Sequence, residues 1–282
     1  MKNLKTYSKI LGFILLSSLM IVSCNKKSSD TQKTELQKIE YEKVTDSVSV
    51  KYYDGKITLQ YPTNGEKSYL DSVRMWIDTM LCYNIFNQEY QTEKFAIFTG
   101  NKMNAKDVAK YYMKKRMPSK KFFDQISNNM DEFGSYELDD SISVTYLGEH
   151  LTSLTFWSYS YYMGAAHGSI AMSSTVFDNQ TGKQYGYDMI ADTTKLKTFI
   201  TEGLIKYFDV KTEQEMLERL FEHKISLPQM PPYFTKEGLT LTYLQYEIAA
   251  YAAGMPKVVI AWKDCKEILK PEFFNKIKQE IK

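Results

Sequence analysis

The chain has 282 residues, of which 36 are Lys or Arg and 34 are Asp or Glu, so its formal net charge is +2. A balance this close to neutrality gives no support to a polyanion-binding protein, and we expect no nucleic-acid partner. The 22 Tyr and 15 Phe residues suit strands with one wetted face, and they equally suit binding surfaces.

The N-terminus is built like an export signal. A basic segment, residues 1–9, precedes an apolar run from Ile10 to Val22. That run is too short to cross a hydrocarbon core of about 30 Å as a helix, but it fits the apolar region of a signal peptide. The residues that end it, Ile21-Val22-Ser23-Cys24, resemble the lipobox of bacterial lipoproteins. The resemblance implies removal of residues 1–23 and lipid on Cys24; the alternative is an ordinary secretory signal followed by an unrelated Cys.

Lipid on Cys24 implies export to the cell envelope and attachment to a membrane, on its periplasmic or cell-surface face. Removal of residues 1–23 deletes three Lys, so 36 − 3 = 33 basic residues face 34 acidic ones, a balance of −1. Residues 24–47 are polar and predict a flexible tether. Cys82 and Cys265 remain; in an oxidising compartment they could form a disulfide, or they could be two separately buried thiols.

The first half of the chain predicts a hairpin and two helices, in a subdomain of residues 48–150. Apolar residues alternate on both sides of Asp54-Gly55, a dipeptide that favours a hairpin turn. Residues 69–81 carry an apolar stripe at helical spacing. A second helix is expected from a cap at Asn104 to just before Pro118.

The second half predicts strands and then further helices, in a subdomain of residues 151–282. Alternating residues indicate strands near 142–146, 151–162 and 170–176, with a turn at 178–182. Thr212 and Glu215 form a capping box, and a last helix begins at Pro271. Hairpins with segregated helices predict an α+β fold of antiparallel sheets and packed helices, in two interleaved subdomains.

The histidines, His150, His167 and His223, lack the spacing of a helical metal site, so we expect no metal and no cofactor. The segment from Tyr161 to Gly168 is the most informative stretch, since it joins two predicted strands through small residues around His167. Its glycines allow a tight turn and the close approach of a ligand. We therefore select a candidate ligand-binding set: Tyr161, Tyr162, Gly164, His167, Gly168 and Tyr246.

Two alternatives accompany this site. The turn could be purely structural, with His167 bonded to the backbone. It could also be catalytic, with His167 as general base and Ser160, Ser169, Asp178 or Asp188 nearby. A separate acidic stretch is a solvated loop or a docking face for a basic protein. Its members are Asp131, Glu132, Glu137, Asp139 and Asp140.

The segment Tyr161-Tyr162-Met163-Gly164-Ala165-Ala166-His167-Gly168 resembles the pattern Tyr-Tyr-x-Gly-Gly-Ala-His-Gly. That pattern is typical of an envelope domain found in lysozyme-responsive anti-sigma factors (RsiV-like) and beside some peptidoglycan deacetylase domains. Residues 178–188 and 234–254 look similar to further pieces of the domain, and the resemblance runs from about residue 48 to 270. The chain departs from the pattern at Ala165, a Gly in the family, and at Gln245, usually a Pro.

The resemblance implies an envelope module that binds a lysozyme-type protein or a peptidoglycan fragment. The resemblance implies no deacetylase activity and no sigma-factor binding, because the deacetylase metal motif and the sigma-binding segment are both missing from the sequence. We therefore expect a lipid-anchored, non-catalytic binding module. The alternative is a cell-wall hydrolase or esterase that uses His167 as general base.

Overall fold

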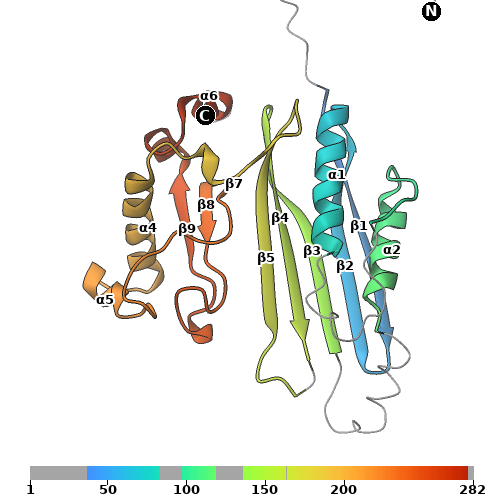
Figure 1. Cartoon of the computed structure of the whole chain (residues 1–282), viewed down its shortest axis with the longest axis horizontal. Coiled ribbons are helices and arrows are strands. Elements are labelled where there is room, and N and C mark those ends of the chain that lie inside the picture. The colour runs from blue at the N-terminus through green and yellow to red at the C-terminus, as the bar shows by residue number, and fades with distance from the viewer. Residues whose placement is uncertain (1–36, 83–96, 119–135, 163, 279–282) are drawn as a thin grey trace, which may run out of the picture. The chain divides into compact units, whose positions relative to one another are not determined.

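The structure is a computed structural model that describes residues 37–82, 97–118, 136–162 and 164–278. Cys24, Asp131 and Glu132 lie outside these residues. Residues Leu36–Lys282 form one compact unit. Within it the described strands make a six-stranded sheet and a three-stranded sheet, with helices packed on both (Figure 1). The predicted α+β class is confirmed.

The six-stranded sheet has the order β1-β2-β3-β4-β5-β6. Its strands are β1 (Glu40–Val50), β2 (Tyr53–Asn64), β3 (Tyr136–Leu147), β4 (Leu151–Tyr161), β5 (Ser169–Asp178) and β6 (Gln184–Tyr185). Neighbouring strands are antiparallel except β2 and β3, which run parallel. This pair is the parallel exception in a sheet that is otherwise antiparallel, as predicted. A parallel pair needs a crossover, and the long connection between β2 and β3 contains α1 (Lys67–Cys82) and α2 (Ala105–Arg116).

Strand β1 corrects the predicted extent of the tether. It begins at Glu40 and pairs with β2 along its whole length, so a tether reaching residue 47 is wrong for residues 40–47. This segment looks unstructured in the sequence because it is an edge strand whose side chains are mostly exposed. Val44 is its one buried residue.

The predicted hairpin exists, but its turn lies at Lys51 and Tyr52. Asp54 and Gly55 belong to β2, where they pair with Ser49 and Val48. Tyr52 has a φ of 70°, a left-handed conformation that glycine adopts more easily. The Asp-Gly dipeptide therefore predicted the right motif at the wrong residues.

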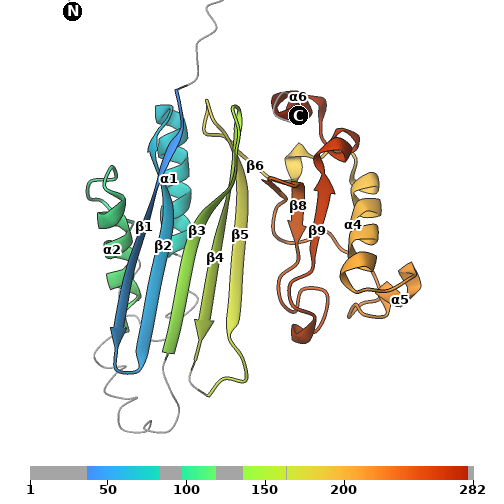
Figure 2. The same cartoon turned by 180° about the vertical axis from the view of Figure 1, so that it is seen from behind.

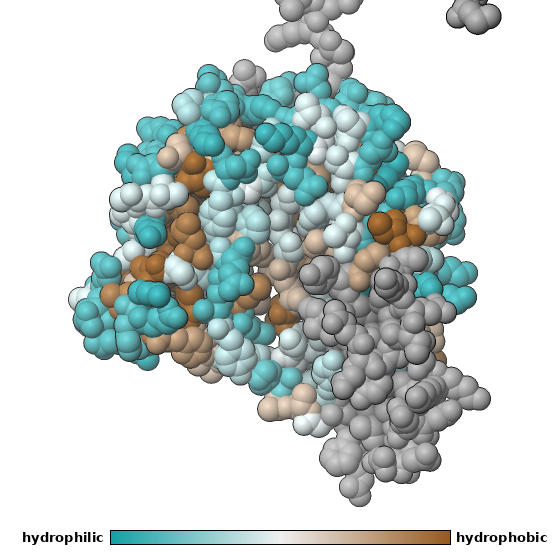
Figure 3. Space-filling model, in the orientation of Figure 1, coloured by the Kyte–Doolittle hydropathy of each residue, from teal (hydrophilic) through white to brown (hydrophobic). Residues whose placement is uncertain are grey.

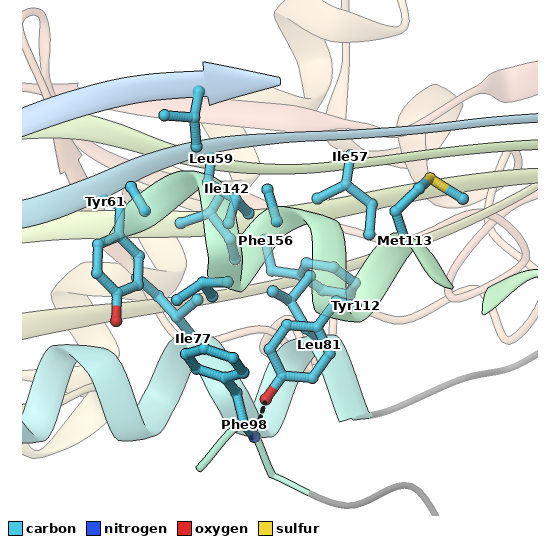
Figure 4. Packing of buried hydrophobic residues seen from close by; sticks show 14 of the residues in the cluster. Ile57, Leu59, Tyr61, Ile77, Leu81, Phe98, Tyr112, Met113, Ile142 and Phe156 are labelled. Carbon is cyan, nitrogen blue, oxygen red and sulfur yellow. Dashed lines mark hydrogen bonds between the residues drawn. The ribbon is translucent and has the colours of Figure 1, made fainter. Parts of the chain in front are cut away.

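Helices α1 and α2 cover one face of the six-stranded sheet and enclose the first hydrophobic cluster (Figure 4). Both helices match their predicted stripes and bounds closely. The side chain of Asn104 caps α2 by accepting hydrogen bonds from the backbone N–H groups of Lys106 and Asp107. From the sheet, Ile142 and Phe156 reach into this cluster, because alternate residues of a strand point to the same face.

Two buried carboxylates near the first cluster, Asp140 and Asp78, have cationic partners. The Nε of Arg116 lies 2.7 Å from Oδ2 of Asp140, and both side chains are almost inaccessible to solvent. The hydroxyl of Tyr112 donates to the buried Asp78 over 2.6 Å, and Lys102 Nζ lies 2.8 Å from the same carboxylate. These contacts join α2 to β3 and to α1, so the apolar layer also holds specific polar contacts.

The three-stranded sheet consists of β7 (Tyr233–Thr235), β8 (Gly238–Thr242) and β9 (Lys257–Ala261), all antiparallel. Helix α4 (Thr193–Tyr207) packs on β9, with α5 (Glu213–Leu217) beside it and α6 (Pro271–Ile277) at the end. Short 3-10 helices are η1 (Tyr187–Met189), η2 (Tyr251–Ala253) and η3 (Trp262–Glu267). Together these elements enclose the second hydrophobic cluster.

A row of hydroxyl groups joins β7 to the face of the six-stranded sheet opposite α1 and α2. The hydroxyl of Ser153 accepts from the backbone N–H of Phe234 over 3.0 Å, and the hydroxyl of Thr145 donates to the carbonyl of Phe234 over 2.8 Å. Ser174 donates to the carbonyl of Pro231. We call these bonds the hydroxyl seam. Since β4 and β5 serve both hydrophobic clusters, the border between the clusters does not follow the chain at residue 150.

Cys82 and Cys265 are free thiols and lie in different hydrophobic clusters, so the predicted possibility of a disulfide between them is not realised. Burial raises the pKa of the Cys265 thiol to about 11, which keeps it protonated at neutral pH. Within the described ranges, the helices are all too short or too polar to span a membrane.

Candidate functional site

The predicted His-containing segment forms the turn between β4 and β5. The ring of His167 is exposed, and both of its nitrogens have partners. Nδ1 lies 2.9 Å from the carbonyl oxygen of Gly168, and Nε2 lies 3.1 Å from the hydroxyl of Tyr246. A carbonyl can only accept, so Nδ1 carries the proton in the neutral ring and Nε2 accepts from Tyr246.

The loop after β8 supplies the other half of the site. The ring of Tyr251 is stacked on His167 with centroids 3.7 Å apart and planes 20° apart. Its hydroxyl donates to the carbonyl of Gly168 over 3.1 Å, so that one oxygen accepts from both His167 and Tyr251. Tyr246 lies 5.6 Å from Tyr251 and 6.0 Å from His167, measured between ring centroids.

Tyr246 is held in a strained position. Its φ is 63°, and 55% of its side chain is exposed. A non-glycine residue in this conformation costs about 1–3 kcal/mol, so the surrounding loop must fix it. Glu247 does so, since its carboxylate accepts from the backbone N–H groups of Leu244 and Gln229 over 2.7 and 2.6 Å. The loop therefore presents an exposed phenol in a fixed place.

Tyr159 extends the cluster onto the sheet. A side chain at Gly168 would meet its ring, since a Cβ there would lie 2.2 Å from Cε2 of Tyr159. The absence of a side chain at Gly168 thus lets the turn lie directly on this ring. Partial burial raises the pKa of Tyr159, and the nearby carboxylate of Glu137 raises it further, so the phenol stays neutral. We name the group of His167, Gly168, Tyr246, Tyr251 and Tyr159 the aromatic site.

The other predicted binding residues have different places. Tyr161 is half-buried on the same face of β4 as Tyr159. Tyr162 is exposed, and its ring packs edge-on against Tyr136 at 5.1 Å between centroids. Gly164 has a φ of 78°, and a Cβ on it would meet nothing within 4 Å. Gly164 therefore serves the conformation of the turn, whereas Gly168 provides space.

The acidic stretch is not a continuous docking face. Asp140 is completely buried against Arg116, which corrects its assignment as a docking residue. Strand alternation places it on the helix-covered face of β3, while its neighbours Glu137 and Asp139 point to the other face. Asp139 lies 2.7 Å from Lys56 Nζ. The sequence could not separate these carboxylates, because the strand was predicted to begin later than Tyr136.

The proposed acid and hydroxyl neighbours of His167 are not assembled. Asp178 lies at the other end of β5, where it pairs with Lys276 of α6. In the described part of the chain, His167 hydrogen-bonds to no serine and to no carboxylate. Among those residues, moreover, His, Cys, Asp and Glu form no group of three or more that could hold a metal ion.

The sequence interpretation missed Tyr159 and Tyr251 as site residues. Alternation with Tyr161 places Tyr159 on the same face of the strand, so this signal was present. Tyr251 lies within a segment that resembles the envelope domain, but nothing local indicates its contact with His167. That contact depends on the tertiary structure.

Comparisons with known proteins give one family match and two similar structures, of which the first supports the fold. Residues 188–263 match the family model described as "Protein of unknown function (DUF3298)". A crystal structure of a DUF3298 family member from Bacteroides fragilis NCTC 9343 is similar, with a TM-score of 0.59 at 17% identity over 86% of this chain and 98% of that one. A DUF3298 family protein from Pseudomonas aeruginosa PAO1 gives a TM-score of 0.49 at 14% identity, over 84% and 96% of the two chains. No curated protein is significantly similar in sequence.

Proposed function

We propose that this protein is an exported, lipid-anchored binding module of the cell envelope, and that its aromatic site binds a saccharide fragment of the cell wall. The observation that carries the proposal is the stack of the exposed His167 on the half-buried Tyr251, with the hydroxyl of Tyr246 fixed beside it. Sugar rings have apolar faces and hydroxyl edges. A site of exposed rings with a few oriented hydrogen-bonding groups therefore complements them.

Binding fits this geometry better than hydrolysis. A general base needs a free lone pair within reach of the proton that it removes. The lone pair of His167 on Nε2 already accepts from Tyr246, and Nδ1 is held by a backbone carbonyl. The hydrolase or esterase alternative would also need a nucleophile or a carboxylate at this ring, and neither is bonded to it among the described residues.

A saccharide is also preferred over a lysozyme-type protein as the ligand. A basic lysozyme-type protein would dock on the acidic stretch, but burial of Asp140 leaves only Glu137 and Asp139 there among the described residues. Asp139 already pairs with Lys56. The exposed rings are a separate and more distinctive feature, so the proposal rests on them.

The test is a calorimetric titration of a chain beginning at residue 25, which keeps the whole compact unit Leu36–Lys282, with muropeptides and with a c-type lysozyme. We expect muropeptides to bind. Tyr246→Phe should weaken binding about fivefold, because it removes the hydroxyl that orients His167. Tyr162→Phe is the matched control, an exposed phenol whose ring packs on Tyr136. Binding of lysozyme alone, or of neither ligand, would refute the saccharide proposal.

The anchor needs its own test. Cells expressing the full chain would be grown with a labelled fatty acid, and the protein would be recovered from the membrane fraction. We expect label on the wild-type chain and none on Cys24→Ala, which should also leave the membrane. Equal labelling of both proteins would refute lipidation at Cys24.

A further inference from the structure

The face of β4 that carries Tyr159 also carries Trp157, and this pair belongs to neither hydrophobic cluster. Their rings are nearly parallel, 10° apart, with centroids separated by 6.1 Å. Both side chains are half-buried. Large rings are usually placed in a core, so a pair that remains outside both cores is available to a ligand.

The two ends of this face of the sheet differ in what covers them. Near the hydroxyl seam, Tyr146 packs against Phe234 and Trp262 and joins the second hydrophobic cluster. Farther along the strands, Trp157 and Tyr159 have no such cover from that cluster. Figure 3 shows the surface hollowed between the region of β8 and β9 and the region of β5. Figure 2 shows the side of β1 to β4 that faces away from α1 and α2.

Trp157 and Tyr159 are continuous with the aromatic site. Tyr159 lies under Gly168, whose carbonyl holds His167 and Tyr251. Alternate residues of a strand are about 6.6 Å apart, so Trp157 adds one further ring position along β4. The rings thus form a band that runs from Tyr246 to Trp157.

Polar side chains lie beside this band on its β3 and β2 side. Trp157 pairs with Ser141, which pairs with Thr58 of β2. Tyr159 pairs with Asp139, whose carboxylate contacts Lys56. The hydroxyl of Thr58 lies 3.2 Å from that of Thr45 and is exposed. On the other side of the band, Trp157 pairs with Met172 and Tyr159 with Ile170 of β5. A row of rings with hydroxyls and charges along one edge and apolar side chains along the other suits an elongated ligand with apolar faces and polar edges.

We infer that the aromatic band is an extended site for a linear oligosaccharide, in which Trp157 and Tyr159 stack on sugar rings beyond the one held at His167. This inference rests on the proposed function and adds the class of ligand: a glycan chain of several pyranose units, rather than a single sugar or a peptide. The ring faces contact the sugar C–H groups, and the flanking side chains of β2 and β3 meet the hydroxyl and amide groups.

The experiment titrates the chain beginning at residue 25 with N-acetylglucosamine and its linear dimer and tetramer. We expect affinity to rise with chain length. Trp157→Ala should weaken tetramer binding roughly three- to tenfold, the value of one aromatic stacking contact, and leave dimer binding unchanged. Tyr162→Ala, the matched control, should change neither.

Intrinsic fluorescence of the wild-type chain gives a second readout that does not depend on the folding of Trp157→Ala. The tetramer should shield a tryptophan from acrylamide quenching, and Trp157→Phe should abolish that shielding. If affinity is independent of length, or if the tetramer shields no tryptophan, the extended site is wrong while the proposed function stands. If none of these sugars and no muropeptide binds, the proposed function itself fails.

Discussion

The two faces of the six-stranded sheet show how one set of strands can serve two purposes. On the face covered by α1 and α2, Ile142 and Phe156 are buried in an apolar cluster and the carboxylate of Asp140 is paired with Arg116. On the opposite face, Trp157 is half-buried and Asp139 forms an ion pair with solvent access. Residues adjacent in sequence thus have opposite environments. The burial and the role of a charge or a ring on this sheet therefore depend on the face that it occupies.

The largest effect expected from this contrast concerns the two aspartates. Asp140→Ala should destabilise the fold by about 3–5 kcal/mol, because it leaves the buried guanidinium of Arg116 without its partner. Asp139→Ala, next to it on the other face, should cost no more than about 1 kcal/mol, as expected for an exposed pair. Urea unfolding of both variants measures this. Equal losses would show that the faces do not differ as described.

The hydroxyl seam gives the next largest effect. Ser153→Ala should cost about 1–3 kcal/mol, since it leaves the buried backbone N–H of Phe234 without an acceptor. Ser143 lies in β3 on the same face of the sheet as Ser153. Ser143→Ala should change the unfolding free energy by less than about 0.5 kcal/mol. If Ser153→Ala is also neutral in urea unfolding, the seam does not join the two sheets in the way proposed.

A pH-dependent contact distinguishes the far end of β5. Lys276 and hydrogen bonds from Thr181 outweigh burial and lower the pKa of Asp178. The folded pKa is below the unfolded one, so the pair contributes stability above about pH 4 and loses it as the pH falls further. Lys276→Met should lower the unfolding free energy by about 1 kcal/mol at pH 7. It should lower it by nothing at a pH where Asp178 is protonated in both the folded and the unfolded state.

Lys278→Met is the matched control for this prediction, because Lys278 lies just after α6 and its ammonium donates to the neutral side chain of Asn275. Urea unfolding at pH 7 and at pH 2 measures both variants. A cost for Lys276→Met that stays constant across this range would show that Asp178 is not the group responsible.

The smallest effect is expected in the turn between β4 and β5. Gly164→Ala places a side chain at a φ of 78°, where there is free space but a left-handed backbone. The cost of that conformation is partly offset by the lower entropy of the unfolded chain, so the net loss should be about 1 kcal/mol or less. Thermal unfolding measures it. Loss of saccharide binding in this variant would show that Gly164 belongs to the aromatic site after all.

Much of the local structure could be predicted from the sequence. The apolar stripe of α1, the Asn104 cap of α2 and the alternation along β4 arise from contacts between neighbours in the chain, and all were confirmed. Half of the predicted capping box of α5 is present: the hydroxyl of Thr212 accepts from the backbone N–H of Glu215, but the carboxylate of Glu215 accepts from the backbone N–H of Lys211 instead of Thr212. Errors arose where a local signal competed with pairing, as with Asp54-Gly55 and with the polar edge strand β1.

The sequence by itself determined the helices α1 and α2, the position of β4, the α+β class and the choice of His167, Gly168 and Tyr246 as residues worth attention. Only the tertiary structure decided that β2 and β3 run parallel, that Asp140 is buried, and that Tyr251 and Tyr159 complete the site. The physical reason is the range of the interactions. Caps and periodicity depend on a few consecutive residues, whereas the aromatic site joins a strand turn to a loop far along the chain, and only folding brings them together.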